Sequence, residues 1–168
     1  KKNPTRAILF LLTVGVFFTA LVWQKRTPVS LKIHSSFPLS YTSTAGLTKE
    51  GNVFSSIDPK RQLLFTFEFK GAKVKSVRKF SNLAVSGLAK GAGSFWSTDA
   101  AGGYIYRHNI DADYSISQTY GNADQSPSAI FWDGKYLWVS DLRTETIYQY
   151  SVTGSLVPTK QYTLPGIV

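Results

Sequence analysis

Sulfur is absent from this chain, because its 168 residues include no cysteine and no methionine. Without cysteine there is no disulfide framework, no thiolate nucleophile and no cysteine-ligated metal site. The redox compartment of the protein therefore cannot be read from its cysteine usage.

Histidine and charged residues are also scarce. The two histidines are His34, in a serine-rich segment, and His108, on a predicted strand, so we expect no metal site shared between them. Charged residues make up only 17% of the chain, whereas 43% are apolar and 14% aromatic. These proportions are typical of a globular chain and not of a disordered one. The residues predict no catalytic set and no cofactor.

A long uncharged apolar run occurs near the start of the chain. Residues 7–23, AILFLLTVGVFFTALVW, are flanked by Arg6 on one side and by Lys25 and Arg26 on the other. As a helix this run is about 25 Å long, close to the lower limit for crossing the hydrocarbon core of a bilayer. We predict a single-pass transmembrane helix that is retained as an anchor, with its basic flanks, over residues 1–26. A cleaved signal peptide is the alternative, because Phe18-Thr19-Ala20 partly matches a cleavage site.

An extended tether, residues 27–44, follows the anchor. Its prolines, serines and threonines exclude a helix, and VSLKIHS alternates as either an outer strand or an extended linker would. Basic residues balance across the anchor, but a short basic amino terminus before a large domain is the usual signal-anchor layout, which places the domain on the periplasmic or extracellular side. Gly15 and Thr19 predict a helix-packing contact, or else a lipid-facing helix with two incidental small residues.

After the tether the sequence repeats itself with a period of about 42 residues and shows no helical periodicity. The copies align at an aromatic residue, at an aliphatic residue and at an acidic residue that ends a strand. These are Phe54, Trp96 and Trp138; Leu64, Ile105 and Ile147; and Asp58, Asp99 and Asp141. Each copy holds four short strand-like runs, which predicts all-β, four-stranded antiparallel blades over about 45–85, 86–127 and 128–164.

Two stretches resemble known propeller blades. FWSTDAAGGYIYRHNIDAD, residues 95–113, is similar to the tyrosine-tryptophan-threonine-aspartate type, and DGKYLWVSDLRTETIYQYS, residues 133–151, resembles NHL and strictosidine-synthase-like blades. The resemblance extends from Ala45 to about Leu164 and implies a propeller-like array of about three blades within a domain of residues 45–168. It implies an architecture and not an activity. The first copy matches least well, with Phe54 in place of the tryptophan.

The repeated aspartates and tryptophans have mainly structural interpretations. An aspartate directly after a strand accepts hydrogen bonds from the turn backbone, and the alternative is that the three carboxylates bind calcium or a substrate together. Trp96 and Trp138 are expected to be buried between blades, because a large flat side chain fills the wedge between adjacent sheets. Trp132, on an innermost strand, is expected in the core or facing the channel or a partner.

Basic residues gather in the first copy and define what we call the basic face. We predict that it binds anionic headgroups or an acidic protein surface, with an ordinary solvated outer strand as the alternative. Its members are Lys60, Arg61, Lys70, Lys73, Lys75, Arg78 and Lys79. Nucleic acid is not an expected partner, because of the anchor and the expected location.

Three blades do not close a propeller, which needs at least four, so something must cover the open faces. The expected covers are other subunits of a membrane protein complex, a second copy of this chain, or further residues of the polypeptide. We therefore favour a membrane-anchored, non-catalytic accessory or scaffold subunit. The alternative is part of a propeller enzyme of the lactonase or cyclotransferase kind, or a ligand-binding propeller.

Overall fold

The computed structural model describes residues 32–33, 36, 44–68, 73–81, 84–121 and 125–164. The chain divides into two units, Lys1–Ser36 and Phe37–Val168, and the strands of the described residues lie in the second. These residues are all-β, and none of them forms a helix that could cross a membrane. The predicted anchor, including Gly15 and Thr19, lies outside them.

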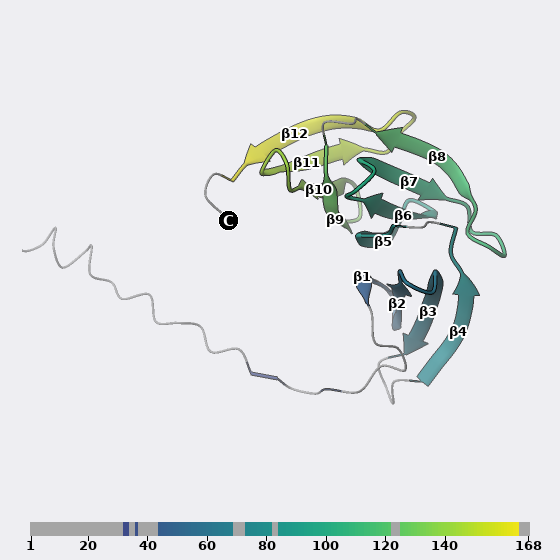
Figure 1. The fold of residues 1–168 in the computed structure, drawn as a ribbon. Helices are drawn as coiled ribbons and strands as arrows, with labels where there is room; N and C mark the ends of the chain where they lie inside the picture. Colours follow the sequence, from purple (N-terminus) through teal and green to yellow (C-terminus); the bar gives the residue numbers. More distant parts are fainter. Residues whose placement is uncertain are drawn as a thin grey trace, which may run out of the picture. The chain divides into compact units, whose positions relative to one another are not determined.

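The described residues of the second unit form three four-stranded antiparallel sheets, each with its strands in sequence order (Figure 1). Blade 1 consists of β1 (Ala45–Glu50), β2 (Val53–Asp58), β3 (Leu63–Glu68) and β4 (Lys73–Lys79). Blade 2 consists of β5 (Gly87–Gly91), β6 (Ser94–Asp99), β7 (Tyr104–His108) and β8 (Ile116–Gly121). Blade 3 consists of β9 (Pro127–Trp132), β10 (Leu137–Asp141), β11 (Thr146–Ser151) and β12 (Val157–Thr163). The predicted four-stranded antiparallel sheets are confirmed.

An aspartate ends the second strand of every blade and shapes the turn into the third. Asp58 and Asp141 each accept hydrogen bonds from the amides two and three residues further on, at 2.9 to 3.2 Å. Asp99 accepts one from the amide of Gly102 at 2.8 Å. The fourth residue after each aspartate has a positive φ, namely Gln62 at 56°, Gly103 at 76° and Glu145 at 49°. The predicted turn role of the aspartates is confirmed.

The innermost strands β1, β5 and β9 lie side by side, and a core fills the space between neighbouring blades. Between blades 1 and 2 this core consists of Ile57, Leu64, Phe80, Val85, Leu88, Phe95 and Tyr114. Phe80, in the linker after β4, is fully buried, and its amide donates to the carbonyl of Gln62 at 2.9 Å. The linker therefore takes part in the interface that it connects.

A second core lies between blades 2 and 3. Its buried members are Ala89, Trp96, Ile105, Ile130, Leu137, Val139 and Tyr150. Trp96 is 1% exposed, and its Nε1 donates a hydrogen bond to the carbonyl of Gly91 at 3.1 Å. The prediction that Trp96 is buried between blades is confirmed.

The predicted equivalence of Phe54 with Trp96 is wrong by one residue. β2 pairs with β3 without a bulge, so Ser55, three residues before Asp58, occupies the position of Trp96. Successive strand residues point to opposite faces of a sheet. Phe54 therefore lies on the other face of blade 1, where its ring stacks on that of Phe67 with centroids 5.8 Å apart.

Candidate functional site

Blade 3 has an apolar face that no strand of the described chain covers. Strand pairing puts Phe131 beside Trp138 and Ile147 beside Tyr162, all on the same side of the sheet. Phe131 is 64% exposed and Tyr162 46% exposed, while Trp138 and Ile147 are half-buried. We call these four residues, together with Leu142 and Leu164, the outward face.

The aromatic pair of the outward face repeats a pair in blade 2. Trp138 stacks on Tyr162 with ring centroids 6.0 Å apart and an interplanar angle of 26°. Trp96 stacks on Tyr120 with centroids 6.2 Å apart and the same angle. The prediction that Trp138 is buried is wrong, because it holds the position of Trp96 on a sheet whose outer side no described strand covers.

The aliphatic positions repeat in the same way. By strand register, Ile147 corresponds to Ile105 of blade 2, and Phe131 corresponds to Ala89. Both blade 2 residues are buried against blade 3. The outward face of blade 3 thus corresponds to the face that blade 2 buries against blade 3. On blade 3 no described strand covers it.

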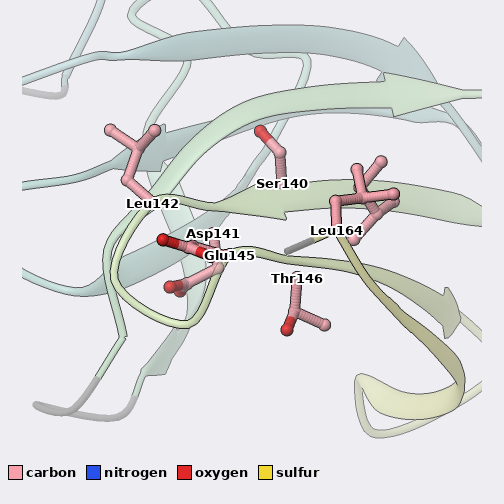
Figure 2. A pocket seen from close by; sticks show the side chains of 7 residues that line it. Ser140, Asp141, Leu142, Glu145, Thr146 and Leu164 are labelled. Atoms are coloured by element: carbon pink, nitrogen blue, oxygen red, sulfur yellow. The ribbon is translucent and has the colours of Figure 1, made fainter. Parts of the chain in front are cut away.

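A cavity of about 170 Å³ lies where β12 leaves the sheet. Its lining consists of Ser140, Asp141, Leu142, Glu145, Thr146, Ile147 and Leu164. Figure 2 shows the side chains of Leu142 and Leu164 on either side of Ser140. Both leucines are exposed, and the amide of Leu164 donates to the carbonyl of Glu145 at 2.9 Å. Apolar side chains at this rim suit another protein surface better than a polar ligand.

A second hollow surrounds Trp132, at the ends of the innermost strands. Two cavities, of about 240 and 350 Å³, are both lined by Trp132, Lys49 and Lys90. A Cβ at Gly91 would lie 2.1 Å from Cγ of Trp132, so the indole rests directly on the Gly91 backbone. Trp132 also packs against the core between blades 2 and 3. Trp132 thus has the expected core contact and also lines two cavities.

The basic face lies on the last strand of blade 1 and on the turn between β2 and β3. Its described members are all exposed, and Lys70 lies outside the described residues. Lys75 pairs with Glu68, and Arg61 lies 3.9 Å from Asp58. The other four, Lys60, Lys73, Arg78 and Lys79, have no ion pair within the described chain.

The repeated aspartates are engaged by the backbone rather than by one another. In addition to its turn bonds, Asp141 accepts a hydrogen bond from the amide of Ser126 at 2.7 Å. Among the described residues, no three histidine or acidic side chains lie close enough together to hold a metal ion. The geometry therefore assigns these carboxylates to turns.

Comparison with solved structures identifies the architecture. The chain is similar to glutaminyl cyclase of Myxococcus xanthus, with a TM-score of 0.54 and 14% identity over 64% of this chain and 47% of that one. It is similar to virginiamycin B lyase of Staphylococcus aureus, with a TM-score of 0.52 and 16% identity over 79% and 45%. It is also similar to a chain of the nidogen/laminin complex, with a TM-score of 0.55 and 15% identity over 76% of this chain and 50% of that one. The fold is that of β-propeller blades.

The propeller chain spans about half the length of these structures. At identities this low, the similarity shows the fold alone. No family model matches the sequence, and a search of curated proteins found no match to it.

His108, which the sequence places on a predicted strand, is a buried residue of the propeller core, and the sequence did not predict that role. It is fully buried, Nδ1 donates to the carbonyl of Tyr114 at 2.8 Å, and Nε2 accepts from the hydroxyl of Ser97 at 2.8 Å. Its ring lies 4.3 Å from that of Phe80. Burial lowers the pKa of His108, against smaller raising effects of the Tyr114 carbonyl and Asp111. The sequence offered one signal, a polar residue on a strand in which polar and apolar residues alternate. That signal does not identify the hydrogen-bond partners of the ring.

Proposed function

We propose that this chain is a non-catalytic accessory or scaffold subunit of a membrane protein complex, with the blades on the periplasmic or extracellular side of a bilayer spanned by residues 7–23. The observation that carries the proposal is the basic face. Four of its cations are exposed and lack an ion pair within the described chain. Three of these four cations, Lys73, Arg78 and Lys79, lie on β4, and such a cluster of unpaired positive charge favours an acidic partner held nearby.

The strand that carries the basic face adds two further features. β4 is the last strand of its sheet, so one edge of its backbone has no partner strand among the described residues. Val74 and Val77 are exposed on the same strand. An acidic protein segment supplies backbone partners, apolar contact and counter-charge together, whereas lipid headgroups supply only the charge. The proposed partner is therefore an acidic surface of a neighbouring subunit.

The test compares two charge reversals of equal size after solubilisation in mild detergent. Lys73→Glu with Arg78→Glu alters the basic face, and Lys135→Glu with Lys160→Glu alters exposed cations of blade 3. The first pair should reduce recovery of a stoichiometric membrane complex about tenfold, and added salt should weaken the parent complex, because exposed charges are screened. The control pair should leave recovery unchanged.

Three outcomes would contradict the proposal. If both pairs of charge reversals reduced recovery of the complex equally, the basic face would not be part of the contact. Binding to anionic vesicles but not to protein would make it a headgroup surface. A mature amino terminus at or after Leu21, measured by intact mass, would remove the anchor.

A ligand-binding propeller is the second candidate, and the hollow around Trp132 favours it. An indole face lies there between two cavities, beside Lys49 and the ion pair of Lys90 with Glu50. Such a hollow suits a small planar ligand with an acidic group. A propeller enzyme of the cyclotransferase or lactonase kind would also place its substrate at such a hollow. Quenching of Trp132 fluorescence by a bound small molecule, lost in Trp132→Phe, would favour this candidate.

A further inference from the structure

We infer that the outward face of blade 3 is one half of a blade–blade interface, and that its occupant is a fourth blade of the same repeat, joined to the polypeptide after Leu164. This inference concerns blade 3 and is independent of the basic face of blade 1.

The kind of occupant follows from what covers the same face in blade 2. Trp96 and Ile105 are buried by side chains from three strands of blade 3, namely Ile130, Leu137, Val139 and Tyr150. Trp138 and Ile147 repeat that pair at the same strand positions and with the same aromatic stacking. The occupant should therefore present aliphatic and aromatic residues at the positions that correspond to those four.

The route of the chain identifies the source of the occupant. Between blades 1 and 2, the Phe80 amide donates to the Gln62 carbonyl at 2.9 Å, and the chain then enters β5. After β12, the Leu164 amide donates to the Glu145 carbonyl at the same distance, and both acceptor residues have positive φ. Leu164 thus has the backbone setting of a linker to a further blade.

The two linker residues, a phenylalanine and a leucine, are both apolar, but they differ in what covers them. Phe80 is fully buried in the core beside Leu64, the residue that corresponds to Ile147. Leu164 (Figure 2) lines the same cavity as Ile147. The side chain of Leu164 is 38% exposed. A blade that follows Leu164 would bury it as blade 2 buries Phe80. This continuity favours the same polypeptide over a separate subunit.

A second copy of this chain fits less well. A second copy that continued the array head to tail would have to present the face of its blade 1 that carries Phe54, Phe65 and Phe67. Phe65 and Phe67 are only 6% and 4% exposed, so that face is already closed.

Two positions on the innermost strand of blade 3 depart from blade 2. Ala129 and Phe131 stand where blade 2 has Gly87 and Ala89. A Cβ at Gly87 would lie 2.8 Å from the Ser128 carbonyl oxygen, so β5 and β9 need the glycine to approach as they do. The innermost strand of the fourth blade should therefore stand farther from β9 at these positions.

The absence of cysteine makes a direct test possible. Ile147→Cys places a single thiol on the outward face, and Ile105→Cys places one at the corresponding position that blade 3 covers. Each is made in the chain alone and in a chain extended after Leu164 by a second copy of residues 123–164. Ala129→Gly and Phe131→Ala in the first copy give β9 the side chains of β5. Maleimide should label the thiol of Ile147→Cys at least about tenfold more slowly in the extended chain, because the interface must open before the thiol reacts.

The controls separate the occupants. An extension with Leu137→Asp in its added copy should give no protection, and Ile105→Cys should react slowly with or without the extension. Equal protection by both extensions, or by neither, would overturn the inference. Labelling of the unextended chain that slows as protein concentration rises would identify a second copy as the cover. In the cells that make the protein, an antibody against the blades should detect a polypeptide larger than 18.6 kDa, and a band of that size alone would exclude a fourth blade in the same polypeptide.

Discussion

At the scale of single residues, His108 couples the stability of the blades to pH. Burial is the largest influence on this side chain and lowers its pKa, so the folded chain favours the neutral ring. The unfolded chain binds a proton near the ordinary histidine pKa of about 6.5. The stability that neutral His108 contributes is therefore fully present above that pH. This contribution is lost as the pH falls from about 6.5 toward the lower pKa of His108 in the folded chain.

The matching experiment measures urea unfolding of the parent chain and of His108→Gln between pH 7.5 and 5. The parent should lose stability across this range, and His108→Gln should lose less because the titrating group is gone. His34, the other histidine of the chain, supplies the matched control. An unchanged pH dependence in His108→Gln, or a reduced one in His34→Gln, would show that the buried ring is not its source.

At the scale of elements, β6 and β10 carry the same tryptophan in different surroundings. Trp96→Ala should cost about 3 to 5 kcal/mol of unfolding free energy, because it removes a fully buried indole from a packed core. Trp138→Ala should cost roughly half of that or less, because its ring is only half-buried. Chemical denaturation of both variants checks the difference, and equal losses would mean that the outer side of blade 3 is covered.

The sequence predicted the repeat, the strands and the turns, because these depend on local signals. Strand alternation and the aspartate after each second strand are properties of a few neighbouring residues. The predictions for Phe54 and Trp138 were wrong because one requires the exact register of β2 and the other requires knowledge of the next sheet. The contact of Trp132 with Gly91 joins strands of two blades, and no spacing rule predicts such a contact.

At the scale of the whole molecule, blade 2 should be the most stable part of the array. It packs on a neighbour through both faces, and all six residues of β6 are buried. Every residue of β12 is exposed, although it pairs with β11 along its length. In arrays of repeats, stability is a sum over units and their neighbouring interfaces.

Hydrogen exchange tests this ranking. Backbone amides of β6 should exchange about a hundredfold or more slowly than those of β12, because strands at the end of an array open without unfolding the rest. Uniform exchange across the three blades would instead show that they unfold as one cooperative unit.

The two stacked tryptophan–tyrosine pairs also differ in their optical properties. The Nε1 of Trp96 bonds to a backbone carbonyl inside a core, whereas that of Trp138 donates to Asp133 at 2.7 Å on an exposed side of blade 3. Mobile water stabilises the excited state of an indole, so Trp138 should emit at longer wavelength than Trp96. Anything that covers blade 3 would shift this emission toward the blue, and the spectrum of Trp138→Phe provides the blank. The propeller thus carries a built-in fluorescent reporter of whether its last blade is in contact with another surface.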